Sequence, residues 1–329
     1  MGSNCRPRLY AEFVLGLLGC LLTHDMAQAQ MSRQRTRTVA GAGHVHNERS
    51  RHFLIHTDLP PCEAKRLAAR LEVLLHRISE YWGKPMQGTI ECYVVRDLDR
   101  FPTTGMDPIG IRAIRAVGGM NVMRTATDGG RYLAKSIVYA DQRPEVIQHE
   151  VVHAYCHQTF GRIGPVWYSE GMAEMGHFWL EGSTAVHADA REVEYLRKSP
   201  PKTIAQALSP HQATGDSWQN YASRWAFCHF MTNAPNYSAH FQAFGRDLLH
   251  GRETCFRQRY GRMARELSFE YLFFLDHLSP NYCVRRTAWQ WKKKFATLRT
   301  GGAVDTTVTA GYGWQPSGLT VRSQVRYEY

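Results

Sequence analysis

Three histidines and one glutamate fall within the nine residues HEVVHAYCH, 149–157. On an α-helix, His149 and His153 lie one turn apart, about 6 Å along the axis and about 40° around it, so both imidazoles reach one point. Glu150 lies on a neighbouring face of the same turn, within reach of a water molecule bound at that point. The pattern therefore predicts a metal ion held by two histidines, with a carboxylate beside its water.

Two histidines do not complete such a site, because a catalytic zinc ion takes three protein ligands and one water. His157 continues the four-residue spacing, but its imidazole is one more turn away from the shared point. A carboxylate on the next helix fits better. Glu170, in the segment WYSEGMAE, follows His153 by 17 residues, which leaves room for a turn and an antiparallel helix. Glu174 lies one turn further on, placed to hydrogen-bond a ligand histidine and fix its tautomer.

HEVVH followed by WYSEGMAE resembles the gluzincin clan of zinc metallopeptidases, in which a downstream glutamate is the third ligand. The metzincin pattern does not fit, because Cys156 and Thr159 stand where it needs glycine and histidine. The closest resemblance is to the peptidase-MA-like family of secreted bacterial proteins, and it covers roughly 52–240. The segments that carry it are HFLIHTDL, YWGKP, SIVYADQRPEVIQHEVVHAY and PVWYSEGMAEMG.

The resemblance implies that His149, His153 and Glu170 are zinc ligands, with Glu150 as catalytic base and Glu174 behind the ligands. The expected activity is hydrolysis of peptide bonds by zinc-activated water, with Zn²⁺ as the cofactor. The metal lowers the pKa of its water, and Glu150 takes the proton and later passes it to the leaving amine.

The developing oxyanion needs a donor besides the zinc ion. The candidates are Tyr221, Tyr168 and His229. We favour Tyr221, because its surroundings predict a helix packed beside the site, although an ordinary tyrosine at the edge of the core fits the sequence equally well. Aminopeptidases of the clan carry a Gly-x-Met-Glu-Asn motif, and GGMNVM (118–123) lacks its glutamate. We therefore expect an endopeptidase.

Two other functions fit the same sequence. A catalytically degenerate gluzincin-fold protein would keep the helices and act as a cell-envelope binding module. A basic module that binds polyanions would need neither the metal nor Glu150, and its binding would weaken steeply with salt. Zinc content, combined with the cleavage activity of a Glu150→Gln variant, separates the enzyme from the first alternative.

The net charge of +11 concentrates toward the two ends of the chain. One basic cluster is SRQRTR (32–37), and the other is RRTAWQWKKK (285–294). The second mixes aromatic and cationic side chains, as single-stranded nucleic-acid sites do, but a solvated helix face is the commoner role of such a run. We expect a peptide or protein substrate and an anionic cell-envelope surface as partners, and no nucleic acid.

The first 29 residues have the features of a signal peptide. Arg6 and Arg8 precede the apolar run FVLGLLGCLL (13–22), and Ala27 and Ala29 match the small residues of a cleavage site. Ten apolar residues are too few to span a bilayer. We expect a secreted, periplasmic or cell-envelope protein whose mature chain has no transmembrane span. A lipoprotein anchored at Cys20 is the second interpretation.

Removing the signal peptide leaves six cysteines. An exported chain permits disulfides, but the wide spacings do not reveal any pairing. Buried free thiols are the other interpretation for Cys156 and Cys228, which lie in apolar helical patterns.

The periodicity of the chain predicts an α+β fold. A flexible basic leader (30–50) precedes one domain, 51–300, in which a small mixed sheet (51–142) is followed by a mostly helical part (143–300). The C-terminal segment 301–329 reads as a β appendage or the start of a further β domain. The expected strands are 52–58, 89–95, 136–140 and a glycine-broken edge strand within 116–124. The expected helices include 60–83, 143–160, 167–180, 190–198, 217–233, 237–249, 253–264, 266–278 and 285–298.

Overall fold

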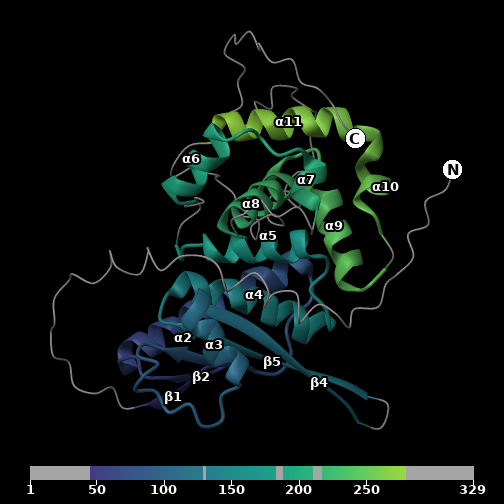
Figure 1. The fold of residues 1–329 in the computed structure, drawn as a ribbon. Helices are drawn as coiled ribbons and strands as arrows, with labels where there is room; N and C mark the ends of the chain where they lie inside the picture. Colours follow the sequence, from purple (N-terminus) through teal and green to yellow (C-terminus); the bar gives the residue numbers. More distant parts are fainter. Residues whose placement is uncertain (1–44, 129–130, 183–187, 210–216, 253, 279–329) are drawn as a thin grey trace, which may run out of the picture.

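A computed structural model of the chain describes residues 45–128, 131–182, 188–209, 217–252 and 254–278. The predicted signal peptide, both basic clusters and the C-terminal β segment lie outside these residues. Figure 1 shows a sheet at one end of the molecule, a layer of helices at the other, and α4 (Pro144–Phe160) between them. The prediction of an α+β fold with a small mixed sheet and a mostly helical remainder is confirmed.

The sheet has five strands in the order β1-β2-β3-β5-β4. The three central strands are parallel, whereas the edge strands β1 and β4 run antiparallel to their neighbours. The strands are β1 (His46–Arg49), β2 (Phe53–Thr57), β3 (Ile90–Val95), β4 (Gly119–Asp128) and β5 (Arg131–Asp141). Residues 46–49, which the sequence analysis assigned to the leader, therefore belong to the sheet.

Two helices cover opposite faces of the sheet. Val94 and Val138 share a core with the amphipathic helix α2 (Pro61–Trp82). Val95 and Tyr139 point to the other face and pack with Ile114 of α3 (Pro108–Val117). Helix α3 is absent from the predicted elements, although it has an N-cap residue and a glycine at its end.

The Asp107 carboxylate caps α3 by accepting a hydrogen bond from the Ile109 N–H, 3.0 Å away. Gly118 ends the helix with φ of 93°, a left-handed conformation that favours glycine. The prediction of a strand broken by glycines within 116–124 is therefore wrong. The glycine pair at 118–119 separates α3 from β4, which runs without interruption from Gly119.

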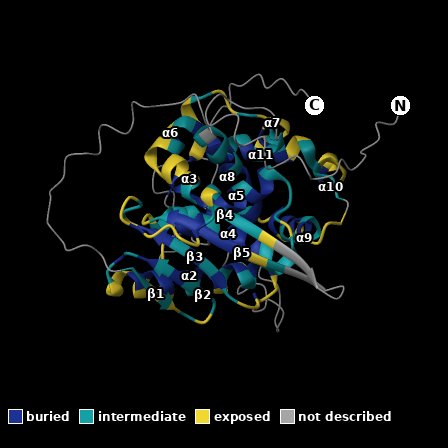
Figure 2. Ribbon diagram, turned by 60° about the horizontal axis from the view of Figure 1, so that its bottom comes forward, coloured by how far each residue is buried: buried dark blue, intermediate teal, exposed yellow. Residues whose placement is uncertain are grey.

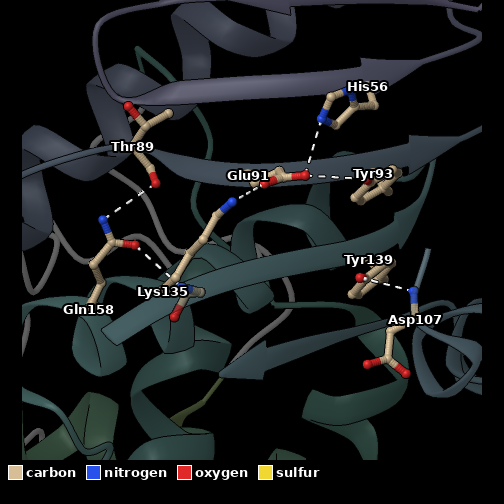
Figure 3. Close-up of polar contacts among 9 residues, drawn as sticks. His56, Thr89, Glu91, Tyr93, Asp107, Lys135, Tyr139 and Gln158 are labelled. Carbon is tan, nitrogen blue, oxygen red and sulfur yellow. Dashed lines mark hydrogen bonds and ion pairs between the residues drawn. The ribbon is translucent and has the colours of Figure 1, made fainter. Parts of the chain in front are cut away.

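The outer face of the sheet, beyond the edge of α3, carries a polar network around Glu91 (Figure 3). Glu91 forms an ion pair with Lys135 and accepts a hydrogen bond from the Tyr93 hydroxyl at 3.2 Å. The Nε2 atom of His56 lies 3.3 Å from the same carboxylate, and its Nδ1 lies 2.7 Å from Asn47 Oδ1. We call these five residues the outer network.

The described chain after the sheet is mostly helical. The helices after α4 are α5 (Val166–His177), α6 (Ala190–Lys198), α7 (Ile204–Leu208), α8 (Ser217–Asn233), α9 (Ser238–Leu249), α10 (Phe256–Tyr260) and α11 (Ala264–His277). The prediction of one helix over 253–264 is wrong, because α10 ends at Tyr260 and tightens into a 3₁₀ turn from Gly261 to Met263. Glycine favours such an interruption, since it is a poor helix former.

The five cysteines in the described residues are all free thiols. Cys92, Cys156 and Cys228 are buried, so the interpretation of Cys156 and Cys228 as core thiols is confirmed. Within the described residues, no helix combines the length and hydrophobicity that crossing a membrane would require.

Candidate metal centre

Helices α4 and α5 form an antiparallel hairpin that brings the predicted ligands together. Two glycines with positive φ, Gly161 at 75° and Gly164 at 81°, reverse the chain between them. The helices approach closely at Gly176, where a Cβ would lie 2.8 Å from Val152 Cγ2. The side-chain amide of Gln148 donates to the carbonyl oxygen of Gly176 at 2.7 Å and fixes their relative position.

Helix α4 has apolar residues on all sides because the sheet and α5 enclose it. Its buried residues run from Ile147 to Cys156 with the single exception of Glu150, and Figure 2 shows this burial along the helix. A helix that is surrounded by other elements shows little amphipathic pattern. The exposed fraction of His149 and of His153 is only 8%. His149 and His153 are therefore largely shielded from solvent.

The three predicted ligand atoms converge on one point. His149 Nε2 lies 3.1 Å from His153 Nε2 and 3.3 Å from Glu170 Oε2. The third side of this triangle, from His153 Nε2 to Glu170 Oε2, is 3.5 Å. Ligand atoms at zinc-bonding distance in a tetrahedral site are about 3.3 Å apart. These three residues, which we call the metal centre, therefore fit one zinc ion without rearrangement.

Glu174 supports the metal centre from behind. Its Oε1 lies 2.9 Å from His149 Nδ1. When Nδ1 carries the proton and donates it to this carboxylate, Nε2 is left as the free donor atom that a metal requires. The structure thus places Glu174 where the sequence predicted it.

His177 joins this group, although the sequence analysis did not single it out. It forms a second, looser set with His149 and Glu174, whose donor atoms lie within 4.8 Å of one another. In that set the Nδ1 of His149 is already hydrogen-bonded to Glu174. The set with Glu170 is therefore the better metal site. The position of His177, three residues after Glu174 on the same helix, was the available sequence signal.

Glu170 and His149 each favour the charged form of the other. Burial alone would raise the pKa of Glu170, but the His153 and His149 rings hold it well below its usual value. Burial alone would lower the pKa of His149, but Glu170 and Glu174 raise it well above the usual value. Among the described residues, no lysine or arginine forms an ion pair with these two glutamates. The metal centre therefore has no competing lysine or arginine from the described residues at the point where a metal cation would bind.

Glu150 lies between the metal centre and the edge strand β4. Burial raises the pKa of Glu150, and the neighbouring His149 and His153 rings oppose this rise. Its carboxylate accepts a hydrogen bond from the backbone N–H of Asn121. Strand and helix approach closely at Gly119, where a Cβ would lie 3.4 Å from Glu150 Cγ. A raised pKa suits a group that takes up and releases a proton near neutral pH.

The structure separates the three candidate oxyanion donors. The Tyr221 ring lies 5.9 Å from the His149 ring, and the charge of Glu170, with burial, raises the pKa of its hydroxyl. The Tyr168 hydroxyl instead accepts a hydrogen bond from Trp82 in the core, 3.0 Å away. His229 is buried in a stack with Trp225. Of the three, Tyr221 is the one whose ring lies against His149 of the metal centre.

The sequence predicted that His157 is not a ligand, and in the structure it lies outside the group of converging donor atoms. Its Nδ1 lies 2.6 Å from the side-chain amide nitrogen of Asn121, on strand β4. Burial lowers the pKa of His157 to about 4, so the ring is neutral at pH 7 and accepts this hydrogen bond. The third histidine of the motif therefore connects α4 to the edge strand, a contact that the sequence did not reveal.

No model of a known protein family matches the chain, and a search of curated proteins finds no relative. The resemblance to gluzincins therefore rests on the motifs themselves.

Proposed function

We propose that this chain is an exported zinc metallopeptidase of the gluzincin type, with His149, His153 and Glu170 as metal ligands. The observation that carries the proposal is the triangle of donor atoms, with sides of 3.1, 3.3 and 3.5 Å. Histidine nitrogens and a carboxylate oxygen are the usual ligands of catalytic zinc. The export part of the proposal rests on the signal-peptide pattern of residues 1–29.

A zinc ion supplies Lewis acidity and lowers the pKa of a water molecule at this position. Glu150 takes the proton of the attacking water on its carboxylate and then gives it to the amine that leaves. Its raised pKa makes the carboxylate a stronger base for this proton. Tyr221, which keeps its proton, donates a hydrogen bond to the oxyanion that develops on the peptide carbonyl.

A peptide is the substrate that the neighbouring strand favours. β4 is an edge strand of the sheet, and its residue Asn121 contacts the base through the backbone. An edge strand has unpaired backbone groups, so an extended peptide can align beside it as an additional strand. This alignment would carry the peptide carbonyl past Glu150 and the metal centre.

Zinc analysis of the purified protein and cleavage of a peptide library test the proposal. We expect one zinc ion per chain and peptide cleavage. Glu150→Gln should keep the zinc ion and lower the cleavage rate by about 10²–10⁴-fold, the usual contribution of a general base. Glu194→Gln, which alters an exposed glutamate on α6, is the matched control.

A protein that binds no zinc, or a Glu150→Gln variant that cleaves like the wild type, would contradict this function. Stoichiometric zinc without cleavage of any library peptide would favour the catalytically degenerate binding module instead.

A further inference from the structure

Two cationic side chains lie near Tyr221, and neither is paired with a carboxylate of the described residues. Lys202 precedes α7, and Arg224 lies on α8; both are half-buried. Lys202 Nζ donates to Asn220 Oδ1 at 3.1 Å, a neutral partner. Neither cation forms an ion pair with any carboxylate in the part of the chain that the structure describes. Burial and the nearby Arg224 charge both lower the pKa of Lys202.

Such an arrangement opposes folding. A half-buried charge loses part of its hydration, and two like charges repel each other more strongly where water is partly excluded. Two half-buried carboxylates elsewhere do have partners within the chain: Asp141 lies 2.8 Å from Arg143, and Glu72 lies 2.7 Å from His52. Among the described residues no carboxylate pairs with Lys202 or Arg224, so the two cations are open to the anionic group of a bound molecule.

The pair lies close to the metal centre. Arg224 follows Tyr221 by three residues, so the two side chains share one face of α8, and the Arg224 charge opposes the rise in the pKa of Tyr221. The Tyr221 ring in turn packs against His149. The backbone of Arg224 lies against α5 at Gly171, where a Cβ would come within 2.6 Å of its carbonyl oxygen. Gly171 is the residue after Glu170.

We propose that Lys202 and Arg224 form a subsite that binds a carboxylate of the peptide substrate. This inference rests on the proposed function and names the substrate class for that same site. The guanidinium binds both oxygens of a carboxylate through two parallel N–H donors, and the ammonium adds a point charge. The carboxylate belongs either to an acidic side chain or to the C-terminus of the peptide.

Peptide binding to the zinc-loaded Glu150→Gln variant tests the subsite without requiring turnover. The probes are fluorescein-labelled peptides of one neutral sequence with a single Glu or Gln moved through it, each with a free or an amidated C-terminus. Fluorescence anisotropy gives the Kd of each. We expect the carboxylate-bearing peptides to bind about tenfold more tightly, since charge-assisted hydrogen bonds are strong.

When Lys202→Met and Arg224→Gln are added to the Glu150→Gln variant, the ratio of the Kd of the neutral peptide to that of the carboxylate-bearing peptide should fall to about one. The matched control is the pair Arg197→Gln and Lys198→Met, which removes two exposed cations from α6 and should preserve the ratio. Arg224→Lys, which keeps the charge but loses the planar fork, should retain part of the preference. Thermal unfolding of each variant shows that it is folded.

The two arms of the probe set identify the source of the carboxylate. A preference for Glu over Gln assigns an acidic side chain, and a preference for the free over the amidated terminus assigns the C-terminal carboxylate. Equal binding of all probes, or a preference that survives the double substitution, overturns the subsite.

Failure of the subsite and failure of the peptidase give different results. If the wild type cleaves neutral peptides without charge preference, the subsite is wrong and the peptidase stands. If Glu150→Gln binds carboxylate-bearing peptides through the two cations and the wild type cleaves none, the peptidase is wrong and the subsite stands.

Discussion

The outer network and the metal centre both place histidine beside glutamate, and of these two only the metal centre has converging donor atoms. In the outer network, Glu91 is paired with Lys135, hydrogen-bonded to Tyr93 and contacted by His56 (Figure 3). In the metal centre, Glu170 faces two imidazoles, and no described lysine or arginine pairs with it. The Glu91 carboxylate of the outer network is already paired with a protein cation, Lys135, whereas Glu170 is not.

The directions of the ring nitrogens make the same distinction. The two nitrogens of His56 contact different partners, Glu91 and Asn47. In the metal centre, the Nε2 atoms of His149 and His153 lie 3.1 Å apart and approach the same carboxylate oxygen. Proximity of histidine and glutamate is therefore common structural chemistry. Convergence of several donor atoms, with no protein cation among them, is what indicates a metal.

Removing one ligand should give the largest effect. His153→Ala leaves two protein ligands, fewer than a stable catalytic zinc site uses, so we expect the zinc content to fall from one per chain to near zero after dialysis. His56→Ala, the matched change in the outer network, should keep the full zinc content. Elemental analysis of both variants measures this. Zinc loss in both variants, or in neither, would erase the distinction between the two regions.

Changing the carboxylate behind the ligand should have a smaller effect. Glu174→Gln removes the charge that orients His149, and we expect zinc affinity to fall about 10–100-fold. Glu72 makes the same kind of contact at 2.7 Å, to the Nδ1 of His52 far from the metal centre. Glu72→Gln should therefore leave zinc affinity unchanged. Titration against a zinc chelator measures both, and equal affinity of Glu174→Gln and wild type would show that this contact does not support a metal.

The sequence predicted those parts of the site that depend on local geometry. His149 and His153 share a helix, so their spacing places them at one point whatever surrounds them. Glu170 follows because a short turn forces the next helix to run back along the first. The two glycines of that turn, Gly161 and Gly164, allow this reversal.

The remaining features depend on contacts between distant segments. The hydrogen bond between Asn121 and His157 joins residues 36 positions apart, and Lys202, which precedes α7, is influenced by the charge of Arg224 on α8. No local pattern encodes such a pair. The short helix α3 was missed for a different reason. The glycines at 118 and 119, which follow the helix, resemble a break in a strand.

The third histidine of α4 tests whether a histidine near the metal centre can be structural. The folded pKa of His157 is about 4, compared with 6.5 when exposed, so the unfolded chain binds the extra proton between these values. Stability is therefore fully present above pH 6.5 and is lost as the pH falls toward 4. Lowering the pH from 7.5 to 5 should therefore reduce the free energy of unfolding by about 2 kcal/mol through this group alone.

His157→Gln can keep the contact with Asn121 but cannot be protonated. Between pH 7.5 and 5 its free energy of unfolding should therefore fall by about 2 kcal/mol less than that of the wild type. Urea unfolding at both pH values measures the difference. Val73→Ala, a change to a non-titrating side chain on α2, controls for general destabilisation. A variant as acid-sensitive as the wild type would assign the acid sensitivity to other groups.

The smallest expected effect belongs to the outer network. Burial alone would raise the pKa of Glu91, but Lys135, Tyr93 and His56 lower it, so the carboxylate contributes stability at neutral pH that is lost as the pH falls through its folded pKa. Because Lys135 is 56% exposed, solvent screens the pair, and a double-mutant cycle of Glu91→Gln with Lys135→Met should yield about 0.5–1 kcal/mol. Zinc content and peptide cleavage should not change in any member of the cycle. A loss of zinc there would mean that the sheet and the metal centre are coupled through β3 and β5, and the two regions could no longer be treated as independent.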